Sequence, residues 1–241
     1  MNDRGLSYYS RIAPPLEQIS AASTAFQQKA SGAVCLSLSQ TLAAKWLGPR
    51  LGDFVSRYPE VEVHINASNS PVNFAQEAVD LAIRHFDGKA PSLSVQLLYG
   101  DEVRLFCTPA YRDALDLRHP NQLLAATLII TRLYQYWDDW LSAFSSIESE
   151  ARRQITALHF DQAMLAIDAA KRGQGVVLSN PLLVQEELKS GELVEPFPHR
   201  LSLNKGYYLV HPNLHDLSPS ARILKDWLLQ QFSQSNASDL L

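Results

Sequence analysis

The sequence is poor in the features that signal several common classes of protein. It has only two cysteines, Cys35 and Cys107, and both lie in apolar stretches, so we expect two buried small side chains rather than a disulfide framework, a redox pair or metal ligands. No apolar run approaches the roughly 18 residues of a membrane span. The N-terminus also lacks the charged-then-apolar layout of a secretory signal. These absences predict a cytoplasmic protein with no membrane partner.

Basic charge is scarce as well. The 241 residues carry 21 Lys and Arg against 25 Asp and Glu, a formal net charge of -4, and Lys and Arg never form a block longer than two residues. Proteins that bind the phosphate backbone of DNA normally present a basic surface. We therefore expect any DNA-binding element to lie outside this chain.

The motifs of the common enzyme classes are also missing. There is no Walker loop, no G-x-S-x-G elbow, no H-E-x-x-H and no C-x-x-C. The glycines at 173 and 175 follow a predicted helix and precede a predicted strand, the reverse of a dinucleotide loop, so we interpret them as a helix end. His211 and His215 have no third metal ligand nearby, and the adjacent Asp138 and Asp139 point about 100° apart on a helix. We expect no enzymatic activity, no metal and no cofactor.

What the sequence does contain is a regular alternation of strands and helices. Val34, Leu36 and Leu38 follow the two-residue period of a strand, and helical spacing begins at Leu42. Such alternation predicts an α/β fold with parallel strands and helices on the sheet faces. The expected strands are 34–39, 61–67, 81–84, 127–131, 155–159, 176–178, 193–197 and 206–210, with two more around Tyr99–Asp101; the expected helices are 42–58, 72–79, 137–144, 162–171, 182–189 and 218–232.

The two ends of the chain have a different character. Residues 6–30 carry apolar side chains at steps of three and four, the seam of a helix that packs either on its own domain or against a second copy. Pro14-Pro15 predicts a kink or a new helix start in this seam. The last residues, 233–241, have the composition of a disordered tail.

Polar residues gather where the predicted strands end. The carboxyl ends of parallel strands meet at one edge of a sheet, which is where α/β proteins hold small ligands. The candidate binding residues at these strand ends are Ser39, Gln40, Thr41, Ser68, Asn69, Ser70, Thr131, Arg132, Asp161 and Gln162. Tyr207 joins them from a later strand, where it and Tyr208 point to opposite faces and at most one is free to meet a ligand.

Each of these residues also has a purely structural interpretation. Thr41 and Asp161 are good helix N-caps, and Pro71 suits the first helical position after a Ser or Asn cap. Arg132 is either a surface side chain or the partner of a ligand carboxylate, which it is able to hold through two parallel hydrogen bonds. The sequence leaves these alternatives open.

Two longer stretches resemble a known family. "PRLGDFVSRYPEVEVHI" from Pro49 to Ile65, followed by "VDLAIR" to Arg84, is similar to the most recognisable segment of the effector-binding domain of LysR-type transcriptional regulators. "AIDAAKRGQGVVLSNPLLVQEELKSGELVEPF" from Ala166 to Phe197 resembles the second half of that domain. The subgroup that looks most similar contains the glycine-cleavage activators and the β-lactamase regulators. The likeness covers residues 32 to about 232, and "NDRGLSYYSRI" resembles the start of the family's linker helix.

The resemblance implies an organisation and a function. It implies two Rossmann-like subdomains of the type 2 periplasmic-binding-protein kind, joined by strands that cross near 106–109 and 207–210. The implied parts are a linker and dimerisation helix (1–31), subdomain I (32–108 with 210–232), subdomain II (109–209) and the tail (233–241). A small-molecule effector, a carboxylate, amino acid or peptide-like metabolite, is expected between the subdomains. The expected partners are further copies, as a homodimer or homotetramer, and promoter DNA through a helix-turn-helix domain missing here. The alternative is a solute-binding protein of a transport system with the same fold.

Overall fold

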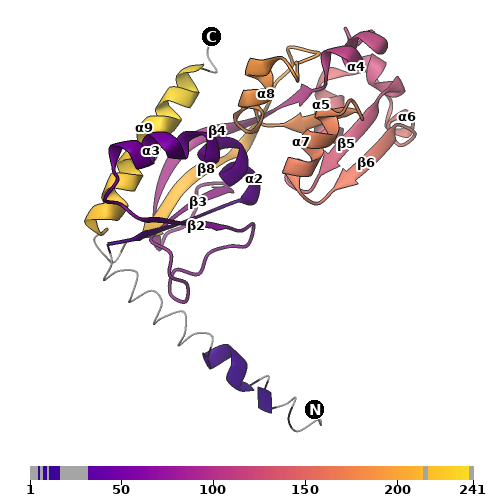
Figure 1. Cartoon of the computed structure of the whole chain (residues 1–241). Helices are drawn as coiled ribbons and strands as arrows, with labels where there is room; N and C mark the ends of the chain where they lie inside the picture. Colours follow the sequence, from indigo (N-terminus) through magenta and orange to yellow (C-terminus); the bar gives the residue numbers. More distant parts are fainter. Residues whose placement is uncertain (1–4, 6–7, 10, 17–31, 214–216, 239–241) are drawn as a thin grey trace. The chain divides into compact units, whose positions relative to one another are not determined.

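The chain folds into two compact units. The computed structural model describes residues 5, 8–9, 11–16, 32–213 and 217–238 (Figure 1). The first unit contains the described residues up to Ser39, Leu51–Tyr99 and the described residues from Gly206 onward. The second unit contains Gln40–Arg50 and Gly100–Lys205. The chain therefore passes between the units at four places, two more than the predicted boundaries provide.

A sheet with strand order β2-β1-β3-β8 forms the centre of the first unit. β1 pairs in parallel with β2 and β3, whereas β3 and β8 are antiparallel. The strands of this unit are β1 (Val34–Leu38), β2 (Val63–Ala67), β3 (Leu81–Phe86) and, shared with the second unit, β4 (Leu93–Phe106) and β8 (Leu201–Pro212). The predicted alternation in β1 is confirmed, because Val34, Leu36 and Leu38 are fully buried.

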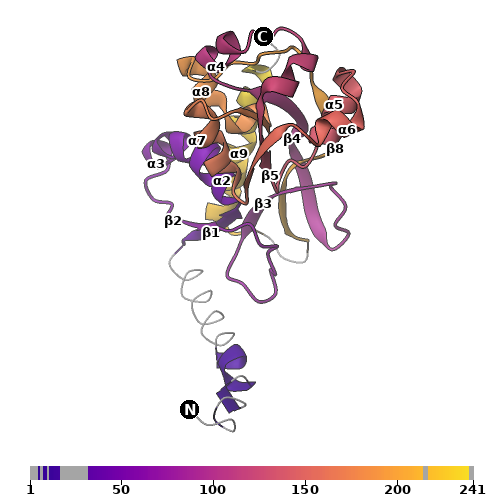
Figure 2. The ribbon, with the colours of Figure 1, turned by 90° about the vertical axis from the view of Figure 1, so that its right-hand side faces the viewer.

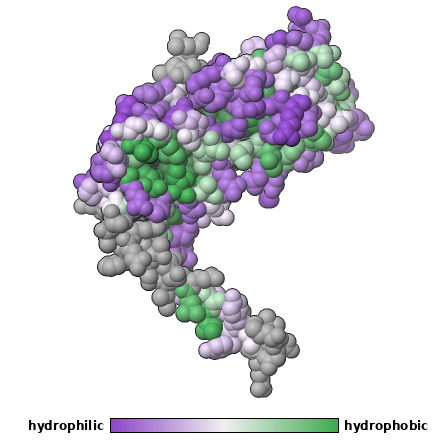
Figure 3. All heavy atoms as spheres, in the orientation of Figure 1, coloured by the Kyte–Doolittle hydropathy of each residue, from purple (hydrophilic) through white to green (hydrophobic). Residues whose placement is uncertain are grey.

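Two helices pack together in the first unit. α3 (Leu51–Arg57) and α9 (Pro219–Ser238) lie side by side in Figure 1. The ring of Phe54 meets Trp227 edge to face at 5.1 Å, and the Trp227 indole N–H donates to an Asp53 carboxylate oxygen at 2.9 Å. Val55, one residue beyond Phe54, is 59% exposed, and Figure 3 shows apolar atoms gathered over this helix.

The strands of the second unit follow the order β4-β7-β5-β6. β5 pairs in parallel with β6 and β7, and α7 packs on these three strands (Figure 2). A side chain at Gly175 would lie 2.3 Å from the Thr127 carbonyl oxygen, so glycine is required where β7 begins beside β5. The elements are β5 (Thr127–Thr131), β6 (Thr156–Phe160), β7 (Val176–Ser179), α4 (Pro109–Ala114), α5 (Trp137–Phe144), α6 (Ser149–Arg152), α7 (Ala163–Lys171), α8 (Gln185–Ser190) and 3-10 turns at Pro120–Ala125 and Pro181–Leu183.

The segment Gln40–Arg50 is helical throughout but irregular. It consists of α2 (Gln40–Leu42), a π-helical turn (Ala43–Leu47) and a 3-10 turn (Gly48–Arg50). Trp46 and Leu47 are fully buried, and the segment belongs to the second unit although β1 and α3 on either side belong to the first. The sequence predicted one helix over 42–58 and did not predict the change of unit.

Several local predictions are wrong. Residues 72–79 form turns instead of a helix, because the Asn73 side chain accepts from the Ala75 N–H at 3.1 Å and Glu77 accepts from the Asn73 N–H at 2.7 Å. The two strands expected around Tyr99–Asp101 are one strand, β4. Residues 193–197 contribute only an isolated bridge, between Val194 and Cys107.

The predictions for the chain ends also change. α9 continues to Ser238, so residues 233–238 are helical rather than disordered, and the Ser233 and Ser235 hydroxyls are satisfied by carbonyls four residues earlier. Residues 239–241 lie outside the described residues. Residues 11–16 are all helical, so no new helix starts at Pro14, and most of the predicted seam from 6 to 30 lies outside the described residues.

Candidate functional site

In the first unit, the ends of β1 and β2 bring two of the predicted binding residues together. Leu38 pairs with Ala67, and the Ser68 N–H donates to the Leu38 carbonyl at 2.9 Å. Ser39 and Ser68, the next residues of their strands, therefore lie beside one another at the carboxyl edge of the sheet. Asn69 and Ser70 follow on the surface and are exposed. Ser39 and Ser68 are thus the two strand-end residues that the first unit brings together.

Tyr207 lies farther along the same sheet, on β8. It pairs with His85 of β3, and the two rings are 5.1 Å apart. Tyr207 is only 2% exposed, whereas Tyr208 on the opposite face is half-buried, beside Phe86. The contact of Tyr207 with a ligand stays a prediction.

In the second unit, a different pair of segments comes together. α2, which carries Gln40 and Thr41, packs against α7, which begins directly after Asp161 and Gln162. Thr131 ends β5 opposite Phe160 of β6, and this register brings it next to Asp161. The second unit therefore gathers polar residues from three segments far apart in the sequence.

The structure decides two of the capping alternatives. Thr41 lies inside α2 and is 4% exposed, so it is not the N-cap of that helix. The N-cap of α7 is Gln162, which makes no side-chain capping bond, so Asp161 is not the cap either. Thr131 has a local role, since its hydroxyl accepts from the Tyr134 N–H at 3.1 Å. Arg132 is exposed.

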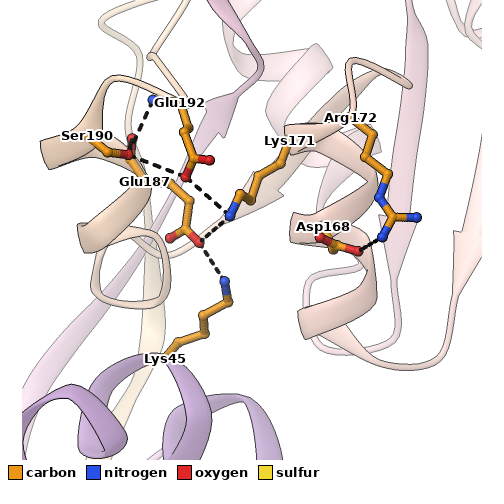
Figure 4. A network of polar contacts seen from close by, with 7 residues as sticks. All are labelled: Lys45, Asp168, Lys171, Arg172, Glu187, Ser190 and Glu192. Carbon is orange, nitrogen blue, oxygen red and sulfur yellow. Dashed lines mark hydrogen bonds and ion pairs between the residues drawn. The ribbon is translucent and has the colours of Figure 1, made fainter.

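A buried carboxylate lies close to these residues in the second unit. Glu187 of α8 is 4% exposed, and its Oε1 accepts from Lys45 of the π-helical turn at 2.5 Å (Figure 4). Lys171 at the end of α7 lies 3.5 Å from the same oxygen and 3.2 Å from Glu192. Gln185 accepts from Arg50 at 2.8 Å. α8 thus ties the Gln40–Arg50 segment and α7 to one another.

The electrostatics of this network are unusual for a carboxylate. Burial alone raises the pKa of Glu187, but the hydrogen bond from Lys45, a backbone N–H and the charges of Lys45 and Lys171 outweigh it, so the pKa lies below its ordinary value. The second oxygen, Oε2, is buried and has no hydrogen-bond partner among the described residues. The carboxylate therefore stays charged and depends on its two lysines.

The cysteines take no part in the site. Burial, with the charges of Asp80 and Glu77, raises the pKa of Cys35 to about 11, and burial raises the pKa of Cys107 to about 12. Both thiols are therefore protonated at neutral pH and are poor nucleophiles and metal ligands. Among the described residues no group of three or more His, Cys, Asp or Glu side chains is placed to hold a metal ion.

Arg84 ends the "VDLAIR" stretch and is not among the binding residues that the sequence predicts. It is the only charged side chain of β3, and its guanidinium donates to the Ser37 hydroxyl at 2.7 Å. The register places it one strand from the end of β1 and opposite Tyr208. In the sequence, Arg84 is marked only as a charged residue at the end of an otherwise apolar predicted strand.

Comparison with known proteins identifies the family. The family described as LysR substrate binding domain matches residues 27–233. The chain belongs to this family. It is 30% identical over 190 residues to the HTH-type transcriptional activator AmpR of Citrobacter koseri, covering 79% of this chain and 64% of that protein. It is 29% identical over 232 residues to the glycine cleavage system transcriptional activator of Escherichia coli K12, covering 95% of this chain and 75% of that protein.

Solved structures agree on the fold. The effector domain of AmpR from Pseudomonas aeruginosa superimposes with a TM-score of 0.72 at 24% identity, covering 87% of this chain and all of that domain. CrgA, a LysR-type regulator from Neisseria meningitidis, gives a TM-score of 0.67 at 18% identity over 96% of this chain and 80% of CrgA. The predicted α/β fold of the type 2 periplasmic-binding-protein kind and the predicted subgroup are both confirmed.

The chain is thus the effector-binding domain of a LysR-type transcriptional regulator, and that family is not enzymatic. Its matches span 64% of the AmpR sequence and 65% of the BlaA regulator of Proteus vulgaris, so the chain corresponds to only part of such proteins. Within the part that the structure describes, no helix is long and apolar enough to cross a membrane.

Proposed function

We propose that this domain senses a small anionic metabolite, a carboxylate, an amino acid or a peptide-like molecule, through the polar strand ends of both units. The signal passes to promoter DNA through a helix-turn-helix domain outside this chain, in a cytoplasmic homodimer or homotetramer. The ligand acts only to the extent that it prefers one conformation of the domain over another.

The observation that carries the proposal is the packing of α2 against α7. α2 carries Gln40 and Thr41, and α7 begins directly after Asp161 and Gln162, although the two segments are far apart in the sequence. Three of these four residues are polar without being charged, and together they offer donors and acceptors of the kind that orient a small polar ligand.

The proposal is tested by thermal unfolding against a panel of carboxylates, amino acids and small peptides. A ligand at 100 times its dissociation constant adds about 2.7 kcal/mol, a shift of several degrees for a domain of this size. We expect at least one ligand that raises the unfolding temperature of the parent. This increase should be smaller in Thr41→Ala and unchanged in Thr156→Ala, which makes the same substitution on the exposed strand β6 and serves as the control. A panel without any hit, or a hit that is equally strong in both variants, contradicts the proposed site.

The competing function, a solute-binding protein of a transport system, shares the fold. The curated relatives described above are transcriptional regulators, which favours the sensor. Light scattering of the purified chain separates the two, because we expect a dimer or tetramer for a regulator and a monomer for a transport protein.

A further inference from the structure

Arg84 is a charged group in surroundings that do not neutralise it. It follows Leu81, Ala82 and Ile83, all of which are buried, and is itself half-buried near the end of β3. Its Nη2 donates to the Ser37 hydroxyl at 2.7 Å and its Nη1 to the Ile83 carbonyl at 3.2 Å. Both acceptors are uncharged, so among the described residues no carboxylate is bound to the guanidinium.

The Nε atom of Arg84 is buried and has no hydrogen-bond partner among the described residues. Burial lowers the pKa of Arg84, and the opposing influence is the charge of Glu77. Glu77 is exposed, and its Oε1 already accepts from the Asn73 N–H at 2.7 Å. An N–H donor kept from water and left unpaired is unfavourable and calls for a ligand or an ordered water.

Arg104 shows how this protein neutralises a buried arginine for structural purposes. Its Nε donates to Glu102 at 2.6 Å and its Nη1 to Glu195 at 2.8 Å. Burial lowers the pKa of Arg104, but the hydrogen bonds and charges of the two glutamates outweigh it and raise the pKa. Arg84 is also a half-buried cation, but no carboxylate of the described residues is bound to it.

We propose that Arg84 anchors the carboxylate group of the effector, with Nε and a terminal nitrogen each donating to one carboxylate oxygen. Guanidinium and carboxylate match in this bidentate geometry. Ser37 keeps the guanidinium oriented, and the register pairs Arg84 of β3 with Tyr208 of β8 and pairs Ala82, two residues earlier, with Ser37 of β1. The inference rests on the proposed sensing function and gives the carboxylate a partner other than the exposed Arg132.

The test follows the arginine Nε–H signals of the whole chain by 15N NMR, with sodium acetate as the carboxylate probe and acetamide as its neutral counterpart. The Arg84 signal is assigned by its loss in Arg84→Lys, and that of Arg104 by its loss in Arg104→Lys. We expect acetate to shift the Arg84 signal in a saturable manner, acetamide to leave it in place and the Arg104 signal not to move. An Arg84 signal that ignores acetate, or responds equally to acetamide, overturns the anchor and indicates a buried water instead.

A second measurement separates this inference from the proposed function. If the thermal panel yields an anionic ligand, we expect its affinity to fall about 10- to 100-fold in Arg84→Met and less in Arg84→Lys, as for the loss of charged hydrogen bonds. A carboxylate ligand that binds Arg84→Met as tightly as the parent overturns the anchor and leaves the sensing function intact. An acetate response without any hit in the panel supports the anchor and counts against the sensing function.

Discussion

Two buried charges of the second unit and one half-buried charge of the first have different kinds of partner. In the second unit, Arg104 is bound to two glutamates, and Glu187 lies against two lysines. In the first unit, the hydrogen-bond partners of Arg84 among the described residues are a serine and a main-chain carbonyl. A buried charge with ionic partners is part of the scaffold, because removing one partner leaves the other uncompensated. A buried charge without such partners does not stabilise the fold, and a ligand of opposite charge would compensate it.

Removal of Lys45 should give the largest effect that follows from this comparison. In Lys45→Met, Glu187 loses its closest cation, and Lys171 at 3.5 Å is left as the only one near it among the described residues. We expect the free energy of unfolding in urea to fall by about 3 kcal/mol, as for a broken buried ion pair.

The matched control is the double variant Lys45→Met with Glu187→Leu, which removes both charges. Because it leaves no carboxylate without its partner, we expect it to recover most of the lost stability. A single variant within about 0.5 kcal/mol of the parent would show that Glu187 is better hydrated than its 4% exposure indicates.

Arg104→Met should destabilise the domain somewhat less, by about 2 kcal/mol. The two glutamates that it leaves behind have side chains 23% and 24% exposed, so water solvates them in part. Urea unfolding measures the change, and Arg118→Met, on an exposed arginine with a side chain 77% exposed, is the control that should have no effect. If Arg104→Met and Arg118→Met lost equal free energy of unfolding, Arg104 would contribute no more to stability than an exposed arginine.

These contrasts mark the limit of what the sequence predicts. The strand period of Val34, Leu36 and Leu38 and the apolar runs at 127–131 and 176–178 follow from local pattern, and so the fold is predictable. The strand-end residues were predictable too, because position at a strand end is local. The ion pairs join residues as distant as Lys45 and Glu187, and no local pattern encodes them.

The failures have the same origin. The helix expected at 72–79 is replaced by turns that side chains of Asn73 and Glu77 stabilise, a competition that apolar spacing does not reveal. Arg84 was overlooked because its significance depends on partners that are absent, and absent partners are visible only once Ser37 and β8 are in place. Sequence therefore predicts where strands end better than which charged groups meet in the fold.

Lowering the pH should reduce the free energy of unfolding by a smaller amount, through the ion pairs of Glu187 with Lys45 and Lys171. The pKa of Glu187 is lower in the folded protein than its ordinary value of 4.5, so the carboxylate stabilises the fold above that pH and loses this contribution as the pH falls through the folded pKa. We expect the free energy of unfolding to fall more steeply below pH 4.5 in the parent than in the Lys45→Met and Glu187→Leu double variant. Parallel pH profiles of the two proteins would mean that Glu187 has the same pKa folded and unfolded.

The smallest effect is expected at Arg84, and it sharpens the comparison most. Arg84→Met removes a half-buried cation that has no carboxylate bound to it and replaces it with an apolar side chain of similar length, so the domain without ligand should stay within about 0.5 kcal/mol of the parent or become more stable. Urea unfolding of Arg84→Met and Arg104→Met under the same conditions compares the two changes in stability. A loss as large as that of Arg104→Met would make Arg84 a structural residue, whereas unchanged stability combined with lost carboxylate binding would identify it as a residue that the fold positions for a ligand.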